Sequence, residues 1–367
     1  MHLYQGFAQS VFDGAVPYRD FFMEYPPGAL AVFLPPQLFG GAHYNAAFKA
    51  LMALCGAATI LVVALLLARF GVSRLRMWVA LALLALSPIA LGPISLNTYD
   101  AWPALLTVAS LLVVPLLGFA LLGLGFAAKV YPVVLLPLAL AFVWRTAGRR
   151  AAAYGAAVFT AVAAVVIVPF LAVAPHGLVE SFRAQAGRSL QVESLGGSLL
   201  GVADRLGLYD ATVVHRTGPT ISYDLVGPLP DALAVASSVT QVGVVLLALW
   251  LLLRGRNDVV RLTAAFAVAI AGFLAFTRFF SPQYLVWLVP FVVLLLPLEW
   301  ALATVALVLA QIWFFHYSDV FALGGYIWLV AVRDLLVVAL FLVLCLRAIE
   351  DQDAVLLEDE TPVRVPA

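Results

Sequence analysis

Long apolar runs recur along this sequence, and each of them has to be buried away from water. Hydrophobic residues make up 64% of the 367 residues and charged residues only 11%, whereas a soluble domain has about 45–50% and 25%. Several runs are long enough to cross the roughly 30 Å of hydrocarbon in a bilayer, and helices satisfy their own backbone groups there. The sequence therefore predicts an all-α fold, that of a polytopic integral membrane protein.

Four arginine-containing segments divide the apolar runs and indicate how the chain is oriented. They are Arg69/Arg74/Arg76, Arg145/Arg149/Arg150, Arg254/Arg256/Arg261 and the single Arg347. Short loops rich in arginine face the cytoplasm, so we expect all four segments there, with about eleven crossings in total and the N-terminus outside. The predicted single crossings are residues 45–68, 77–91, 101–116, 151–174, 232–253, 263–276, 284–298, 301–315 and 325–346.

The apolar stretch of residues 118–144 is interrupted near its middle by Lys129 and Pro132. It is too short for two full spans and too long for one untilted span, so we expect two short helices that meet at the outer side. Broken helices at membrane depth line polar cavities. Because an ammonium group in hydrocarbon is costly, Lys129 is expected to face such a cavity and a phosphate partner; snorkelling to the interface is the alternative.

Polar residues concentrate in two loops that this topology places outside the cytoplasm, residues 1–44 and residues 175–231. All five histidines fall on that side, and so do all ten acidic residues from Asp13 to Asp231. We interpret residues 1–348 as one membrane domain and the acidic residues 349–367 as a disordered cytoplasmic tail. The candidate site is therefore expected at the outer face.

The first outer loop contains the stretch GAVPYRDFFMEYPPGAL, in which three prolines prevent a helix. Asp20 and Glu24 are its candidate acid or base, and Arg19 is a candidate phosphate ligand. Arg19 precedes Asp20 directly and would keep that carboxyl ionised if the side chains come close. An ordinary loop solvated by water is the alternative interpretation.

The second outer loop contains HGLVESFRAQAGRSLQVESLGGSLLG. Arg188 and Gln191 lie three positions apart, which would place them on one helix face, where they could hold an anionic head group. An amphipathic helix on the membrane surface is an interpretation compatible with this one. In RFFSPQYLVWLVPF, Arg278 and Gln283 would face the same cavity if the loops converge, whereas Tyr284 and Trp287 are typical interfacial aromatics.

Two further acidic positions have structural interpretations. Asp100 follows the polar segment SLNTY and is expected to cap a helix. Arg333 and Asp334 are adjacent, so we expect them not to face one another on a helix and assign them no role. The full set of candidate substrate-binding residues is Tyr4, Arg19, Tyr25, Asp100, Lys129, Tyr131, His176, Arg188, Gln191, Glu193, Arg278 and Gln283.

Several classes of function are disfavoured. The net charge is zero, which argues against a nucleic-acid partner. Cys55 and Cys345 lie in apolar runs and are interpreted as core residues. We find no glycine-rich nucleotide loop, no Cys/His metal spacing and no Ser-His-Asp pattern, so we predict neither a cofactor nor a required metal. A donor would reach the site from the membrane or its outer face.

Five motifs together resemble glycosyltransferase family 87: GAVPYRDFFMEYPP, YDAWPALL, GLGFAAKVYPVVLLPL, RSLQVESLGGSLL and FSPQYLVWLVPF. They occur in the family's order within residues 1 to 291. The resemblance implies a GT-C-like multi-helix bundle with its active site at the extracytoplasmic surface of the cell membrane. It also implies a polyprenyl-phosphate sugar donor, with mannose as the sugar, and a lipid or glycan acceptor. The membrane lipids around the bundle are a further partner.

The sequence departs from the family at one position. The family's usual acid is an aspartate in a D-x-x-x-Y pattern at the end of its first transmembrane helix. Aligned on Tyr4, that pattern puts the aspartate directly before Met1, so we expect the first helix and its aspartate to be missing together. Asp20 is then the preferred substitute base, ahead of Glu24.

A transporter or flippase of a lipid-linked sugar is the alternative function. Broken helices and buried charges also occur in transporters. However, the sequence has no internal repeat of the kind common in them, and its charges gather in the outer loops rather than at mid-membrane. These two observations favour the enzyme.

Overall fold

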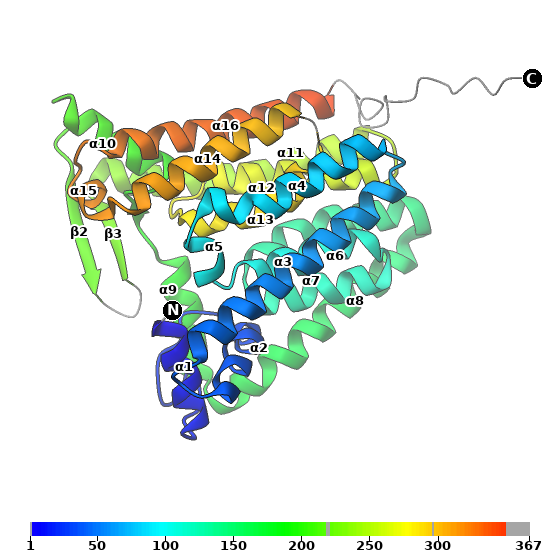
Figure 1. The fold of residues 1–367 in the computed structure, drawn as a ribbon, viewed down its shortest axis with the longest axis horizontal. Coiled ribbons are helices and arrows are strands. Elements are labelled where there is room, and N and C mark those ends of the chain that lie inside the picture. The colour runs from blue at the N-terminus through cyan, green and yellow to red at the C-terminus, as the bar shows by residue number, and fades with distance from the viewer. Residues whose placement is uncertain (1, 218–220, 296, 350–367) are drawn as a thin grey trace, which may run out of the picture.

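The computed structural model describes residues 2–217, 221–295 and 297–349, which form a helical bundle with a small sheet at one end (Figure 1). Within these described residues, six helical segments are long and apolar enough to cross a membrane. They are α3 (Tyr44–Arg69), α4 (Arg74–Leu91), Tyr131–Val173 with α8 (Leu136–Val173), α11 (Pro228–Arg254), α14 (Pro297–Phe314) and α16 (Ile327–Ile349). The predicted all-α, polytopic membrane fold is confirmed.

Shorter apolar helices fill the space between the long ones. They are α6 (Ala101–Leu112), α7 (Leu116–Ala128), α12 (Val259–Ala275) and α13 (Leu285–Val292). Helix α12 is buried on nearly all sides, as Phe266 and Ile270 show, and it packs on α11, α13 and α16. A helix that is hydrophobic all round is stable only inside a larger bundle, so α12 forms the centre of the core.

The arginine segments meet at one end of the bundle. Their side chains bind backbone carbonyls and one carboxylate at the ends of other helices, which satisfies carbonyls that the helices leave free. The contacts are Arg76 to Leu295 O (3.0 Å), Arg145 to Leu252 O (2.8 Å), Arg261 to Ala348 O (2.8 Å) and Arg347 to Glu299 (2.5 Å). All four arginine segments thus lie at the same end of the bundle, which agrees with the predicted even number of membrane crossings between them. That this end faces the cytoplasm stays a prediction.

Two breaks occur near the predicted positions in the middle of the chain. Helix α7 ends at Ala128, and after an extended Lys129 a short 3₁₀ turn, η3 (Tyr131–Leu135), leads into α8. This is the predicted break at Lys129. Within α8, Gly148 has φ +85° and interrupts the helix between Arg145 and Arg149, a conformation that glycine adopts without strain.

The opposite end of the bundle carries a cap of short elements, seen at the left of Figure 1, away from the end of α16. The three strands form an antiparallel sheet in the order β1-β3-β2. The elements of the cap are α1 (His2–Phe12), η1 (Pro27–Ala29), α2 (Leu30–Phe33), η2 (Pro35–Phe39), α5 (Ile94–Asn97), α9 (Pro175–Ala186), β1 (Leu190–Gln191), α10 (Leu195–Arg205), β2 (Thr212–Thr217), β3 (Ile221–Val226), η4 (Pro282–Tyr284) and α15 (Tyr317–Phe321).

The sheet corrects one expectation about the second outer loop. Arg188 and Gln191 were predicted to share a helix face, but α9 has already ended at Ala186, and Gln191 belongs to β1, where it pairs with Asp224. The amphipathic helix is thus only the first part of this loop. The predicted acidic tail lies outside the described residues from position 350 onward.

Candidate functional site

A cavity of about 590 Å³ lies where the cap meets the bundle. Its wall is formed by the first outer loop, the break between α7 and α8, the end of α9, and the segment from Arg278 to Trp287. It is lined by Tyr4, Glu24, Tyr25, Pro26, Tyr99, Lys129, Val130, Tyr131, Phe182, Gln185, Ala186, Arg188, Ile221, Ser238, Gln241, Phe273, Arg278, Phe279, Ser281, Gln283, Tyr284 and Trp287.

The first outer loop approaches the cavity because Gly28 lets it pack closely on the end of α7. A Cβ atom at Gly28 would lie 2.6 Å from the backbone carbonyl carbon of Ala127, a distance that no side chain tolerates against backbone. Pro26 and Pro27, which directly precede Gly28, stiffen the chain at this contact, and Pro27 begins η1. As a result Glu24 and Tyr25 lie in the same cavity as Lys129.

Lys129 is held at the break by a carboxylate and three aromatic rings. Its ammonium donates a hydrogen bond to Asp100 Oδ1 and lies 4.7 to 4.9 Å from the ring centres of Tyr99, Tyr284 and Trp287. The pairing and the cation–π contacts replace the solvation that the ammonium loses. The side chain is only 13% exposed, so it does not snorkel, and its observed partner is Asp100.

Asp100 is therefore not the helix cap that its position suggested. Its side chain caps no backbone N–H of α6. Instead its Oδ1 atom accepts hydrogen bonds from Lys129 and from Trp287 Nε1, the latter at 2.6 Å. It lies behind the cavity wall, 1% exposed, where it fixes Lys129 and the indole ring.

A second ion pair crosses the cavity. Arg188 Nη2 lies 3.3 Å from Glu24 Oε2, and both side chains are largely buried. Arg188 also stacks over the ring of Phe279, 5.3 Å from its centre, while Gln185 donates a hydrogen bond to Glu24 O. The pair joins the first outer loop to the segment between α9 and β1, which lie far apart in the sequence.

Arg278 is the third cation in the cavity and differs from the other two. Its guanidinium donates to the carbonyl of Ala186, and within the described part of the chain it has no carboxylate partner. Guanidinium groups bind phosphate through several N–H donors. Arg278 is thus available for an anionic ligand.

The structure gathers most of the predicted site residues into this cavity. Eight of the candidates line it: Tyr4, Glu24, Tyr25, Lys129, Tyr131, Arg188, Arg278 and Gln283. Asp100 lies directly behind them and is connected to the cavity through its hydrogen bonds with Lys129 and Trp287. Five candidates are not among the lining residues: Arg19, Asp20, His176, Gln191 and Glu193.

Arg19 and Asp20 turn away from the cavity. They form an exposed pair with an N–O distance of 2.9 Å, and Asp20 also accepts a hydrogen bond from Val16 N. The hydrogen bond from Arg19 lowers the pKa of Asp20 to about 2, so Asp20 is ionised as expected. Asp20, the preferred substitute base in the sequence, is nevertheless not among the lining residues, because its carboxylate bonds to its own loop.

The other three candidates outside the wall differ in their surroundings. His176 is exposed at the start of α9, and Gln191 is buried in β1. Glu193 is held near Arg333, whose guanidinium donates to Glu193 O at 2.7 Å, and burial raises the pKa of the Glu193 carboxyl to about 8. None of the three is among the residues that line the cavity.

The expectation for Arg333 and Asp334 was also wrong. The two adjacent side chains form an ion pair with a distance of 2.8 Å, and both are almost completely buried. Arg333 is long enough to fold back toward its neighbour while its guanidinium stacks on the ring of Phe280 at 4.0 Å. Ser198 of α10 donates to Asp334, so the pair ties α16 to the cap.

Several lining residues were not predicted from the sequence. Tyr284 and Trp287 were interpreted as interfacial aromatics, yet Tyr131, Trp287 and Tyr284 form a continuous stack with ring centres 4.0 and 4.3 Å apart. Tyr284 and Trp287 are three positions apart, a spacing that places two rings on one helix face and could have indicated the stack from the sequence. The sequence around Ser238 and Gln241 of α11 contains no comparable indication that they line a cavity.

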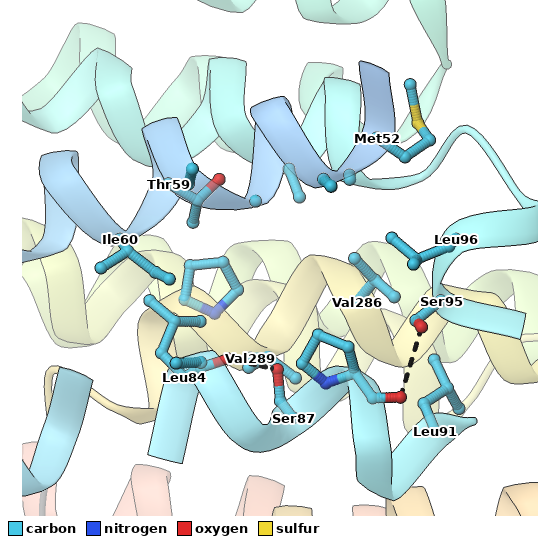
Figure 2. A pocket seen from close by; sticks show the side chains of 18 of the residues that line it. Met52, Thr59, Ile60, Leu84, Ser87, Leu91, Ser95, Leu96, Val286 and Val289 are labelled. Atoms are coloured by element: carbon cyan, nitrogen blue, oxygen red, sulfur yellow. Dashed lines mark hydrogen bonds between the residues drawn. The ribbon is translucent and has the colours of Figure 1, made fainter. Parts of the chain in front are cut away.

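A separate apolar cavity of about 300 Å³ lies between α3, α4 and α13 (Figure 2). Its serines are satisfied locally: Ser87 donates to Leu84 O, and Ser95 donates to Gly92 O. No charged side chain lines it. This apolar cavity is therefore unsuited to an ionic reaction.

Comparison with protein families gives a match. The model of a family described as glycosyltransferase family 87 matches residues 22–282, a stretch that includes the break at Lys129, both ion pairs of the cavity, and Arg278. Neither the curated proteins nor the solved structures contain a match to this chain.

Proposed function

This chain belongs to glycosyltransferase family 87, and from that membership we propose that it transfers mannose from a polyprenyl-phosphate donor to a lipid or glycan acceptor. The reaction takes place in the cavity between cap and bundle, at the extracytoplasmic face of the cell membrane. The mannosyl donor and this orientation rest on the resemblance of the motifs and on the arginine distribution. A further helix with an aspartate before Met1 stays a prediction from the same resemblance.

The observation that carries the proposal is the charge arrangement of the cavity. Glu24 supplies a carboxylate beside Arg188, and Arg278 supplies a cation without a carboxylate partner among the described residues. A sugar phosphate brings one anionic phosphate, and its acceptor brings a hydroxyl that must lose a proton. The cavity therefore offers a cation, Arg278, for the phosphate and a carboxylate, Glu24, for the proton of the acceptor hydroxyl.

In the proposed reaction Glu24 is the base. Its carboxylate takes the proton of the acceptor hydroxyl, whose oxygen forms a new bond to the anomeric carbon of the sugar. The bond from that carbon to the phosphate oxygen breaks, and the electron pair leaves with the polyprenyl phosphate. Glu24 replaces Asp20 in this role because Asp20 lies outside the cavity.

The cations act on the leaving group. As the carbon–oxygen bond breaks, negative charge grows on the phosphate, and a cation fixed at that point stabilises the transition state more than the ground state. Arg278 is our primary candidate, because its charge is not offset by an acid. Lys129 is a weaker one, because Asp100 and Trp287 hold it in a nearly neutral group.

A direct assay tests the proposal. Membranes containing the full chain are incubated with labelled polyprenyl-phosphate mannose, and transfer to lipid or glycan is measured. Arg278→Ala is expected to lower kcat by about 10²–10³-fold. The matched control is Arg183→Ala, an exposed arginine on α9 outside the cavity wall, which should leave kcat unchanged. Full activity from a nucleotide sugar without a lipid-linked intermediate would contradict the donor assignment.

The alternative function, a transporter or flippase of lipid-linked sugars, drew its support from the broken helix and its buried charge. The buried charges of Lys129 and Arg188 are paired with Asp100 and Glu24, and the family is one of transferases. Movement of the labelled donor across a vesicle membrane without any transferred sugar would favour the transporter.

A further inference from the structure

The wall of the cavity contains charged and apolar side chains. The charged ones are the two ion pairs' members Glu24, Lys129 and Arg188, together with Arg278. Apolar side chains also line it, among them Val130, Phe182 and Phe273. This combination fits a ligand with a charged head and a hydrocarbon chain, because each part of the ligand can meet atoms of its own polarity.

The cavity reaches the surface of the bundle next to Lys129. Val130, the residue after Lys129, is 38% exposed although it lines the cavity. On the other side of this point, Ser238 and Gln241 of α11 line the cavity one helical turn apart. Gln241 donates a hydrogen bond to Phe273 O, which fixes α11 to the end of α12 at this level.

The outer face of α11 here is apolar and faces away from the protein. Val235, Val239 and Val242 are 64%, 67% and 62% exposed, and α11 is one of the candidate membrane spans. In a membrane protein such a face contacts lipid. The cavity therefore opens sideways, between α11 and the break at Lys129, toward the hydrocarbon.

The opening lies at the level where the cap ends and the bundle begins. Ala234, one turn before Ser238, packs with Leu190 and Leu225 of the sheet. Val244, one turn after Gln241, belongs to the core of the bundle. A lipid phosphate resides at such a boundary, with its chain pointing into the hydrocarbon below it.

We infer that the isoprenoid chain of the donor leaves the cavity through this opening, between Ser238 and Gln241 of α11 and Val130 at the helix break. This inference rests on the proposed polyprenyl-phosphate donor and adds the path of its chain. With the phosphate at Arg278, the first isoprene units lie against Val130 and Phe273. Ser238, whose small side chain faces the path, keeps it open.

The apolar cavity of Figure 2 does not provide this path. This cavity and a neighbouring one of about 340 Å³ between α4, α13 and α14 are also apolar enough for a hydrocarbon chain. However, the lining residues Ala101 and Val286 of the Figure 2 cavity directly neighbour Asp100 and Trp287 in the sequence, and these two are 1% and 3% exposed and bonded to each other. A chain that entered from the polar cavity past these residues would have to break this bond.

The test compares two donors and two tryptophan variants in the full chain, reconstituted in lipid nanodiscs. One donor carries a full-length polyprenyl chain, and the other is a water-soluble analogue with a single isoprene unit. Ser238→Trp is expected to raise KM for the long donor by about tenfold or more and to leave KM for the short donor nearly unchanged. Val239→Trp, on the lipid-facing side of the same turn, is the control and should change neither value.

A second measurement uses the unaltered protein and so does not depend on how a variant folds. A polyprenyl-phosphate mannose with a photoreactive group in its first isoprene units is crosslinked, and the labelled peptides are identified. Labels on residues 128–133 and 234–245 are expected. Labels on α3 and α4 beside the cavity of Figure 2, or equal KM increases for both donors with Ser238→Trp, would overturn the inference.

The two proposals can fail separately. If the unaltered protein transfers no sugar from either lipid donor, the proposed function is wrong. If it transfers sugar from the long donor, and Ser238→Trp does so with the KM of the unaltered protein, the function stands and the path of the chain is wrong.

Discussion

Lys129 and Asp100, 29 positions apart in the sequence, form an ion pair at the break between α7 and α8, and Trp287 Nε1 donates to the same carboxylate oxygen. The pair connects three separate segments: the start of α6, the break itself, and α13. It sets the position of a cation on one side of the cavity and of an aromatic stack on another. The geometry of the site thus depends on a carboxylate that is itself outside the cavity.

We expect the ion pair between Lys129 and Asp100 to contribute to the stability of the folded protein as a unit. Asp100→Asn removes the negative charge and leaves a buried ammonium, which costs about 3–5 kcal/mol when one partner of a buried pair is lost. The double variant Asp100→Asn/Lys129→Met should recover part of that loss. Denaturant unfolding of the two single variants and the double variant gives the coupling energy. Additive effects of the two substitutions would show that the pair does not act as a unit.

Glu24 and Asp20 are predicted to differ sharply in catalysis. Glu24→Gln removes the base from the cavity and should lower kcat by about 10²–10⁴-fold, with KM for the donor little changed. Asp20→Asn alters the exposed pair with Arg19 and the hydrogen bond from Val16 N, both outside the cavity, and should leave kcat unchanged. Steady-state kinetics of both variants decide the assignment. A large loss with Asp20→Asn and none with Glu24→Gln would restore the choice made from the sequence.

Glu193 is expected to make the stability of the cap depend on pH. Because burial raises the pKa of its carboxyl from 4.5 to about 8, the folded state binds this proton more tightly than the unfolded state does. The free energy of unfolding should therefore fall as the pH rises from about 4.5 to about 8, and the loss should be complete above that.

Glu193→Gln, which cannot ionise, tests this dependence. We expect it to flatten the change of Tm over that pH range and to raise Tm relative to the unaltered protein at alkaline pH. Asp20→Asn is a suitable contrast, since the pKa of Asp20 is lowered to about 2, so its contribution to stability is lost only in strong acid. Identical pH profiles for Glu193→Gln and the unaltered chain would refute the prediction.

The orientation of the bundle is open to chemical labelling. Cys55 and Cys345 are buried and can be replaced to give a background without cysteine. A cysteine at Leu208, 77% exposed in the cap, should react with a membrane-impermeant reagent from the extracytoplasmic side. A cysteine at Leu75, 76% exposed beside Arg74, should react only after the membrane is opened. The reverse pattern would place the site in the cytoplasm.

Features set by local sequence were predictable, and pairings between distant segments were not. The break at Lys129 follows from a charge and a proline within an apolar run. The Arg188 and Gln191 prediction failed because the partner strand of Gln191 lies at Asp224, a pairing that no short window contains. Asp20 was misplaced because its competing partners, Arg19 and Val16 N, are local and draw its carboxylate outward.

The short length of α7 determines how the site sits in a bilayer. Its 13 residues span about 20 Å, whereas the hydrocarbon layer is about 30 Å thick. We expect this hydrophobic mismatch to hold Lys129 below the plane that the long helices reach, so that head groups dip or the bilayer thins beside it. Sterols and long acyl chains thicken membranes, so lipid composition sets the height at which a lipid-borne phosphate meets this protein.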